Sequence, residues 1–292
     1  MISGSIVAIV TPFKNGKVDE KKLTELVDFQ INNGTNGIVP CGTTGESPTL
    51  SYEEHTRVIE ICIEATHGRV PVIAGTGSNS TAEAVELTRH AAEAGADAVL
   101  IVSPYYNKPT QKGLYAHFKT IANAVDIPII LYNIPGRTSC NIEPATMAQL
   151  ANDCKTITGV KEASGSLAQM QDIKRLCPKE FFLLSGDDAL LLPVLSIGGK
   201  GVISVAANIV PQDILRIITA YADGHLQEAQ QMYYKLLPLV QALFLETNPI
   251  PIKTAMGLMG LCSDELRLPL CSMTDSNKDK LKNVLKEFGL IK

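Results

Sequence analysis

The chain has 292 residues, of which 45% are hydrophobic and 19% are charged, and its formal net charge is −4. This length and composition suffice for a large buried core, and the weak negative charge argues against nucleic-acid binding, which needs a basic surface. No apolar run approaches the roughly 20 residues that a helix needs to cross a bilayer, so we expect no membrane segment.

The cysteines indicate a reducing compartment. Their number is odd, and no two have the Cys-x-x-Cys spacing. The first residues, Met1 to Ser5, lack the basic start of a signal peptide. We therefore expect reduced, mostly buried thiols in a cytoplasmic protein. The seven cysteines stand at positions 41, 62, 140, 154, 177, 262 and 271.

Eight short apolar runs recur through the first 220 residues, each followed by polar or glycine-rich residues and then by a helical stretch. Such runs are typical of parallel strands that are buried on both faces. Eight strand–helix units of this size predict a (β/α)8 TIM barrel, and the alternative is a doubly wound open sheet. The runs span residues 6–10, 37–40, 70–74, 98–102, 128–132, 157–161, 181–184 and 201–205.

Helix boundaries are marked between these runs. Two Ser-x-x-Glu sequences, at residues 51–54 and 80–83, predict capping boxes. Three glycines, at positions 34, 68 and 95, stand where helices should end. These signals support an alternation of strands with helices.

The pattern changes after residue 224. Residues 225–245 form one long helical stretch with no strand after it, and the sequence Asn248-Pro249-Ile250-Pro251 interrupts the chain. Two further helical stretches follow, near 252–260 and 275–288. We therefore predict a catalytic barrel over residues 1–224 and a small all-helical C-terminal extension over residues 225–292.

Lys161 is the most informative residue at a predicted strand end, where barrel enzymes place their chemistry. It closes the apolar run of residues 157–160. Burial disfavours the charged ammonium, and the neutral amine is the form that attacks a carbonyl. A nucleophilic lysine is therefore the functional hypothesis, and a strand-end lysine that reaches solvent is the alternative.

Other strand ends carry groups that suit a carboxylate substrate. Thr43 and Thr44 lie in a turn between glycines, which can present backbone N–H groups to an anion. Tyr132 and Tyr106 are phenols that can pass protons, and Arg137 can hold a carboxylate with its planar fork. Each has a structural alternative, namely an ordinary turn, aromatic packing and a solvated arginine.

The chain lacks the usual signals of metal, phosphate and dinucleotide sites. None of the five histidines stands at a predicted strand end, and the pair Asp187-Asp188 is more typical of a helix cap than of a magnesium site. The loop over residues 75–80 misses the third glycine of a dinucleotide motif. We therefore expect neither a metal nor a cofactor, and a carboxylate substrate in place of a sugar phosphate.

Several motifs resemble, in order and along the whole chain, those of the 4-hydroxy-tetrahydrodipicolinate synthase family, formerly called dihydrodipicolinate synthase. The resemblance implies a lyase of lysine biosynthesis by the diaminopimelate route, which condenses pyruvate with L-aspartate 4-semialdehyde. The motifs are Gly42-Thr43-Thr44-Gly45-Glu46-Ser47, Pro104-Tyr105-Tyr106-Asn107, Tyr132-Asn133-Ile134-Pro135-Gly136-Arg137-Thr138, Gly159-Val160-Lys161-Glu162-Ala163 and Asn248-Pro249-Ile250-Pro251-Ile252-Lys253.

The resemblance assigns proton chemistry to four residues. Lys161 forms the Schiff base with pyruvate, and Thr43, Tyr132 and Tyr106 form a proton relay. Tyr106 reaches into the site from a neighbouring subunit. The family is usually a homotetramer, a dimer of dimers, and we expect the same here.

The same resemblance assigns substrate contacts. Thr44 and its turn hold the pyruvate carboxylate, while Arg137 orients Tyr132 and binds the semialdehyde carboxylate. Gly186 and Ile203 contact the bound substrates. Arg137 also favours the synthase over two sister families, the N-acetylneuraminate lyases and the 2-keto-3-deoxy sugar-acid aldolases, which lack an arginine in this loop. A non-catalytic barrel that binds small carboxylates is the alternative from another functional class.

Relatives that lysine inhibits bind it at a dimer interface, and the resemblance extends to that second site. A tyrosine at position 52, where many sensitive relatives have histidine, and the proline at position 48 depart from the pattern. We expect lysine to be an effector. The matching positions are Ser47, Pro48, His55, Asn79, Glu83 and Tyr105.

Overall fold

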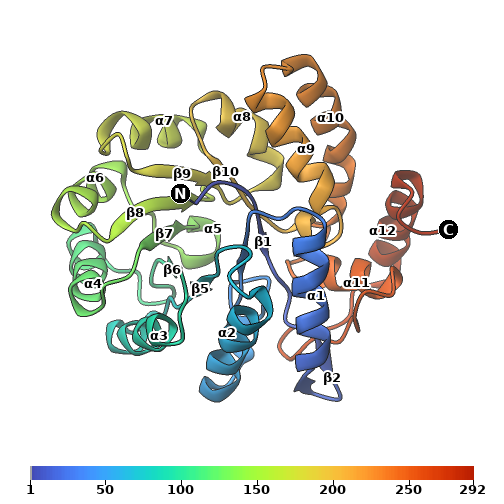
Figure 1. Cartoon of the computed structure of the whole chain (residues 1–292), viewed down its shortest axis with the longest axis horizontal. Coiled ribbons are helices and arrows are strands. Elements are labelled where there is room, and N and C mark those ends of the chain that lie inside the picture. Colours follow the sequence, from blue (N-terminus) through green and yellow to red (C-terminus); the bar gives the residue numbers. More distant parts are fainter. Residues whose placement is uncertain (1) are drawn as a thin grey trace.

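The computed structural model describes residues 2–292, and Met1 lies outside the described residues. Eight parallel strands form one sheet in the order β4-β1-β10-β9-β8-β7-β6-β5 (Figure 1). A parallel bridge between Ile38 and Val72 joins the two end strands and closes the sheet into a barrel. The strands are β1 (Gly4–Ala8), β4 (Gly37–Val39), β5 (Ile73–Gly75), β6 (Ala98–Val102), β7 (Ile129–Asn133), β8 (Ile157–Glu162), β9 (Phe182–Ser185) and β10 (Gly201–Ser204).

All eight predicted strands are present, and the closure rules out the open-sheet alternative. The third strand shows the largest displacement, because it begins at Ile73 and the prediction began at residue 70. Pro71 stands in that interval and has no N–H to donate to a ladder. The first strand begins at Gly4, two residues before the predicted start.

A helix follows each barrel strand, and the helices form a ring outside the sheet (Figure 1). A short helix, α5 (Pro135–Thr138), lies in the loop after β7, and a hairpin of β2 (Phe13–Lys14) and β3 (Lys17–Val18) follows β1. The ring helices are α1 (Glu20–Asn32), α2 (Tyr52–Thr66), α3 (Thr81–Glu93), α4 (Gln111–Ala124), α6 (Pro144–Asp153), α7 (Leu167–Leu176), α8 (Leu191–Ser196) and α9 (Pro211–Ala222).

The predicted helix boundaries are largely confirmed. Ser51 and Glu54 form a complete capping box at the start of α2. The glycines at 34, 68 and 95 all have positive φ angles. The second capping box was half wrong: Ser80 accepts a hydrogen bond from the Glu83 N–H, but the Glu83 carboxylate accepts from the Ser78 hydroxyl instead of returning to Ser80.

Three helices make up residues 225–292: α10 (Leu226–Ala242), α11 (Ile250–Leu258) and α12 (Asp275–Phe288). They match the three predicted helical stretches. Helix α10 packs against α9 of the barrel, and α12 packs against α10 and α11. We propose residue 224 as the boundary between barrel and extension, because α10, which begins at Leu226, is a helix with no barrel strand after it. No helix among residues 2–292 is long and apolar enough to span a bilayer.

The core has two parts. They are separate because successive side chains along each strand point to opposite faces of the sheet. One cluster fills the barrel interior and includes Ile6, Tyr132, Leu184 and Ile203. A larger cluster fills the layer between the strands and the helices, and Val160 belongs to it. Because successive strand residues point to opposite faces, Lys161 points into the barrel and its neighbours point toward the helices.

Candidate active site

Lys161 lies on β8 and is only 6% exposed, which rules out the alternative of a lysine that reaches bulk solvent. It stands in register with Tyr132 on β7 and Leu184 on β9. Its Nζ atom lies 4.1 Å from the centre of the Tyr132 ring. The amine is thus held inside the barrel against the face of an aromatic ring.

Gly186 follows β9 directly, and its N–H donates a hydrogen bond to the Glu162 carbonyl at 2.8 Å. A Cβ atom at this position would lie 3.1 Å from Lys161 Cε and 2.7 Å from Ala163 Cβ. Gly186 therefore makes room for the lysine side chain. Ile203, 1% exposed on β10, belongs to the apolar cluster inside the barrel.

The turn that carries Thr43 and Thr44 follows β4. Two of its hydrogen bonds run from Gly45 N–H to the Gly42 carbonyl (3.1 Å) and from Glu46 N–H to the Thr43 carbonyl (3.1 Å). Within residues 2–292, no atom accepts a hydrogen bond from the backbone N–H of Thr43 or Thr44. These two donors are therefore free to bind an anion.

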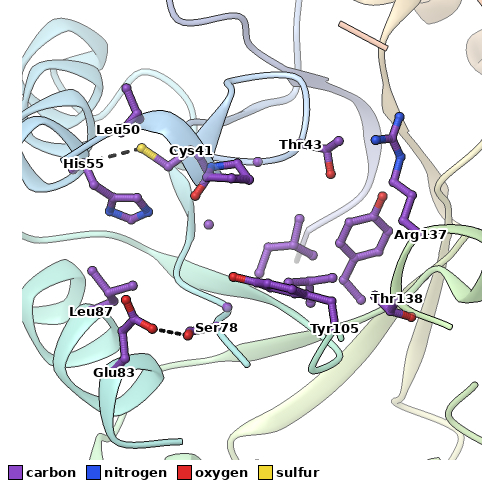
Figure 2. A pocket seen from close by; sticks show the side chains of 18 of the residues that line it. Cys41, Thr43, Leu50, His55, Ser78, Glu83, Leu87, Tyr105, Arg137 and Thr138 are labelled. Atoms are coloured by element: carbon purple, nitrogen blue, oxygen red, sulfur yellow. Dashed lines mark hydrogen bonds between the residues drawn. The ribbon is translucent and has the colours of Figure 1, made fainter. Parts of the chain in front are cut away.

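Arg137 lies on α5, immediately after the strand that carries Tyr132. Its Nη2 donates a hydrogen bond to the Asn248 carbonyl at 3.0 Å. Arg137 is exposed at the mouth of the barrel, and Figure 2 shows its guanidinium on the same side of the pocket as Thr43. The site thus combines a buried amine, two free N–H groups and an exposed cation.

A buried polar network holds the loop that carries Arg137. The Glu162 carboxylate, fully buried on the helix-facing side of β8, accepts hydrogen bonds from Asn133 Nδ2 (3.0 Å), Gln169 Nε2 (3.2 Å) and Ser164 N–H (2.7 Å). The Asn133 side chain in turn accepts from the Ile142 N–H at 2.9 Å. Both ends of the loop over residues 134–141 are therefore fastened to β7 and β8.

A cavity of about 350 Å³ opens beside these residues. Thr43, Tyr132, Arg137 and Thr138 line one end of it, and Figure 2 shows Tyr105 projecting into it. Lys161 is not among the lining residues, but the Tyr132 ring that its amine contacts is one of them. A cavity of this kind suits small-molecule ligands.

Tyr106 is the one predicted relay residue that the single chain keeps away from the site. It is 90% exposed, has a φ angle of 73° and does not line the cavity. No hydrogen bond joins Thr43, Tyr132 and Tyr106 within the described part of the chain. The three-residue relay therefore stays a prediction, which needs a second copy of the chain.

The far end of the cavity is lined by five of the six positions assigned to a lysine effector: Ser47, Pro48, His55, Glu83 and Tyr105. The sixth, Asn79, donates a hydrogen bond to the Tyr105 carbonyl at 3.2 Å. Figure 2 shows His55 and Glu83 on opposite walls of this end. The six predicted positions are therefore gathered in one place.

The charges at this far end are set by local hydrogen bonds and burial. The Ser78 hydroxyl, together with the Tyr52 hydroxyl, lowers the pKa of the Glu83 carboxyl, and Glu83 raises the pKa of Tyr52 to about 12. Burial lowers the pKa of His55 to about 4. The far end thus presents a carboxylate and a neutral imidazole at neutral pH.

The aspartate pair and the glycine-rich loop, which the sequence offers as weak signals of a magnesium site and a dinucleotide site, have structural explanations. Asp187 caps the short helix after β9 by accepting from the Ala189 N–H, as predicted, and Asp188 accepts from the Val205 and Ala206 N–H groups. At Gly75, which ends β5, and at Gly77 in the loop after it, a Cβ atom would overlap the neighbouring backbone. These glycines allow close contact between adjacent segments.

Two residues that sequence reasoning missed support the site. The sequence indicates Asn248 as a break in the chain and as the start of a family motif but gives it no role, yet it contacts both Thr44 and Arg137. Ser78 was noted only as part of a weak cofactor loop, yet it binds Glu83. No periodicity or spacing could reveal the first contact, because 204 residues separate Asn248 from Thr44.

A closed (β/α)8 barrel with a buried lysine near one strand end, and with a turn that has free N–H groups at the end of another strand, is typical of class I aldolases, which are lyases. The model of the dihydrodipicolinate synthetase family matches residues 1–288. The 4-hydroxy-tetrahydrodipicolinate synthases of Syntrophus aciditrophicus and Endomicrobium trichonymphae are both 60% identical to this chain, over the full length of each protein.

Solved structures agree with this match. The dihydrodipicolinate synthase from Aquifex aeolicus is 51% identical, with a TM-score of 0.98 over 99% of each chain. The enzyme from Thermotoga maritima is 44% identical, with a TM-score of 0.98 over 100% of each chain. The chain belongs to the dihydrodipicolinate synthetase family.

Proposed function

We propose that the chain condenses pyruvate with L-aspartate 4-semialdehyde to give 4-hydroxy-tetrahydrodipicolinate, in the diaminopimelate route to lysine. Full-length membership of the family supports the reaction. The observation that carries the mechanism is the Lys161 amine, buried in the barrel and in contact with the Tyr132 ring. The proposal needs no metal and no cofactor, because the amine itself activates the keto acid.

The chemistry follows from a buried amine next to a phenol ring. The Lys161 amine adds to the pyruvate carbonyl and expels water, which leaves an imine. Loss of a proton from the pyruvate methyl group gives an enamine, whose carbon bonds to the aldehyde carbon of the second substrate. The amino group of that substrate then attacks the imine carbon, closes the ring and releases Lys161.

The remaining roles are proposals that rest on position. Tyr132 and Thr43 exchange protons with the reacting atoms, and Tyr106 of a second copy completes the relay. The free N–H groups of the turn around Thr44 hold the pyruvate carboxylate, and Arg137 holds the carboxylate of the semialdehyde.

Two further positions shape the pocket in this proposal. Gly186 leaves space beside the lysine, and Ile203 forms an apolar wall within the barrel. Gly186 follows β9, which is next in the sheet to the strand that carries Lys161. Ile203 lies on β10, one strand further on. Neither supplies a reacting group.

The homotetrameric assembly, a dimer of dimers, is also a proposal. The 90% exposure of Tyr106 supports it, since a phenol needed in the relay is left outside the chain's own site. One structural relative, 43% identical, is described as a monomeric dihydrodipicolinate synthase variant. Analytical ultracentrifugation should give a tetramer, and a sole monomer with full activity would remove Tyr106 from the mechanism.

Lysine as an effector is supported by the far end of the cavity, where the Glu83 carboxylate suits an ammonium group. The dihydrodipicolinate synthase of Cyanidioschyzon merolae, 44% identical with a TM-score of 0.97, has been solved with lysine bound. Calorimetric titration with lysine tests this proposal, and Glu83→Gln should weaken binding.

A cytoplasmic location is proposed with the biosynthetic role and agrees with seven unpaired cysteines, of which Cys271 is exposed.

A coupled assay tests the reaction directly. Pyruvate and aspartate semialdehyde should be consumed together, and the same preparation should turn over N-acetylneuraminate or 2-keto-3-deoxygluconate far more slowly. Preferential cleavage of either sugar acid would instead assign to the chain the activity of the N-acetylneuraminate lyases or of the 2-keto-3-deoxy sugar-acid aldolases. Absence of turnover with all three substrates would leave only carboxylate binding.

A further inference from the structure

Asn248 connects the two elements that hold carboxylates. Its side-chain Nδ2 donates a hydrogen bond to Thr44 Oγ1 at 3.0 Å, and its backbone carbonyl accepts one from Arg137 Nη2, also at 3.0 Å. The residue belongs to the C-terminal extension, between α10 and α11. One residue outside the barrel thus touches the turn after β4 and the loop after β7.

The surroundings of Asn248 make these contacts specific. The residue is 5% exposed, and within residues 2–292 its Oδ1 atom has no hydrogen-bond partner. The bond to Thr44 is therefore the one polar contact of the side chain in the described structure. Truncation of the side chain removes that bond and leaves the backbone carbonyl, and with it the contact to Arg137, in place.

A second contact fastens the same turn to the extension. Glu46, two residues after Thr44, forms a buried ion pair with Lys253 of α11 at 2.6 Å. The second oxygen of Glu46 accepts from the Arg267 N–H at 3.2 Å. The extension therefore contacts the turn at Thr44 and at Glu46. These contacts restrict the movement of the free N–H groups of Thr43 and Thr44.

We propose that Asn248 is a positioning residue that holds the pyruvate-binding turn through its side chain and Arg137 through its backbone. This inference rests on the proposed function and deepens it. The Asn248 side chain sets the affinity for pyruvate. Its backbone carbonyl restrains Arg137, which binds the semialdehyde carboxylate. The extension thereby takes part in substrate binding without touching a reacting atom.

The variant Asn248→Ala separates the two contacts. Its half-saturating pyruvate concentration should rise by roughly threefold to tenfold, which corresponds to the loss of one hydrogen bond. The half-saturating semialdehyde concentration should change less than about twofold. The same rise should appear when pyruvate alone is trapped on the protein with borohydride, because this measurement does not involve the second substrate.

Two further variants keep the test decisive if Asn248→Ala folds poorly. Thr44→Val removes the acceptor of the same bond, and the double variant should show no additional rise in half-saturating pyruvate. Asn277→Ala removes another amide of the extension, which donates to Glu246 at 2.9 Å, and should leave both substrate concentrations unchanged.

Equal weakening of both substrates in Asn248→Ala, or additive effects of Asn248→Ala and Thr44→Val, would overturn the proposal. So would unchanged pyruvate dependence in a variant that keeps the wild-type melting temperature. These outcomes are distinct from failure of the proposed function, in which the unaltered protein itself gives no pyruvate adduct at any concentration.

Discussion

Gly186 lies against Lys161, and the absence of a side chain at position 186 is what allows the lysine to extend inside the barrel. A Cβ atom there would come within 3.1 Å of Lys161 Cε and 3.2 Å of its Cγ. The contact comes from the turn after β9, the strand next to the one that carries the lysine. The position of the Lys161 amine therefore depends on the neighbouring strand as well as on its own.

Gly186→Ala should reduce the reactivity of the lysine. The added methyl group must displace either the Lys161 side chain or Ala163, and such overpacking costs about 1–3 kcal/mol. We expect the rate of borohydride-trapped pyruvate adduct formation to fall about tenfold or more. Time courses of trapping at saturating pyruvate, followed by mass spectrometry, measure this rate.

Gly136→Ala is the matched control, because a Cβ atom at Gly136 meets nothing within 4 Å. It should form the pyruvate adduct at the rate of the unaltered protein. Similar losses in the two variants would show that crowding of the lysine is not the cause, and full activity of Gly186→Ala would contradict the account.

Arg137→Ala should separate the two substrates. The Arg137 guanidinium is exposed, whereas Lys161 and Thr44 of the proposed pyruvate-binding turn are buried. Adduct formation with pyruvate alone should therefore persist. Loss of a charge-assisted contact should raise the half-saturating semialdehyde concentration by about tenfold to a hundredfold. Steady-state kinetics with each substrate varied in turn gives both values, and loss of the pyruvate adduct would refute the assignment.

Glu162→Gln should destabilise the protein. The buried carboxylate accepts hydrogen bonds from three donor groups, and a glutamine would turn an NH₂ group toward some of those donors. Buried donors without acceptors cost about 1–3 kcal/mol. Urea unfolding measures the change, and the exposed Glu180→Gln serves as the control, with an expected change below about 0.5 kcal/mol. Equal stability of the two variants would mean that the network does not restrain the loop.

His117 should make the stability depend on pH. It is buried between α3 and α4, its Nδ1 lies 2.9 Å from Thr81 Oγ1, and burial lowers its pKa to about 4. An unfolded histidine binds a proton near pH 6.5, so the unfolded state gains protons before the folded state does. The free energy of unfolding should therefore fall as the pH drops from 6.5 toward 4, by about 2 kcal/mol at pH 5 from this residue.

His117→Asn keeps a polar group near Thr81 and removes the titration. Chemical unfolding at pH 8 and pH 5 should show a smaller loss for this variant than for the unaltered protein. His55, whose pKa is also lowered to about 4 by burial, should retain its own contribution. An identical loss in both proteins would mean that His117 is not protonated on unfolding in this range.

Local patterns were sufficient to predict the architecture. Parallel strands inside a ring of helices are apolar on both faces, so each of the eight appears as a short continuous run. The second capping box failed because a nearby hydroxyl, that of Ser78, competes for the carboxylate of Glu83. A three-residue spacing cannot reveal a competitor that lies outside it.

The site was only partly predictable. Lys161 could be found because a charged residue closing an apolar run is unusual, and the strand-end rule for barrels then placed it at the mouth. The contact of Asn248 with Thr44 depends on how the extension packs on the barrel, which no local pattern encodes. The proposed role of Tyr106 requires a second chain, so a single sequence could supply it only through resemblance.

The central claim is that the amine of Lys161 bonds covalently to pyruvate, and one measurement tests it most directly. The protein is incubated with pyruvate, reduced with borohydride, digested and analysed by peptide mass spectrometry, with Lys161→Ala treated in parallel. The account predicts one reduced pyruvate adduct on the peptide that contains Lys161, and none in the variant. An unmodified Lys161 peptide, or an adduct that persists in the variant, would contradict it.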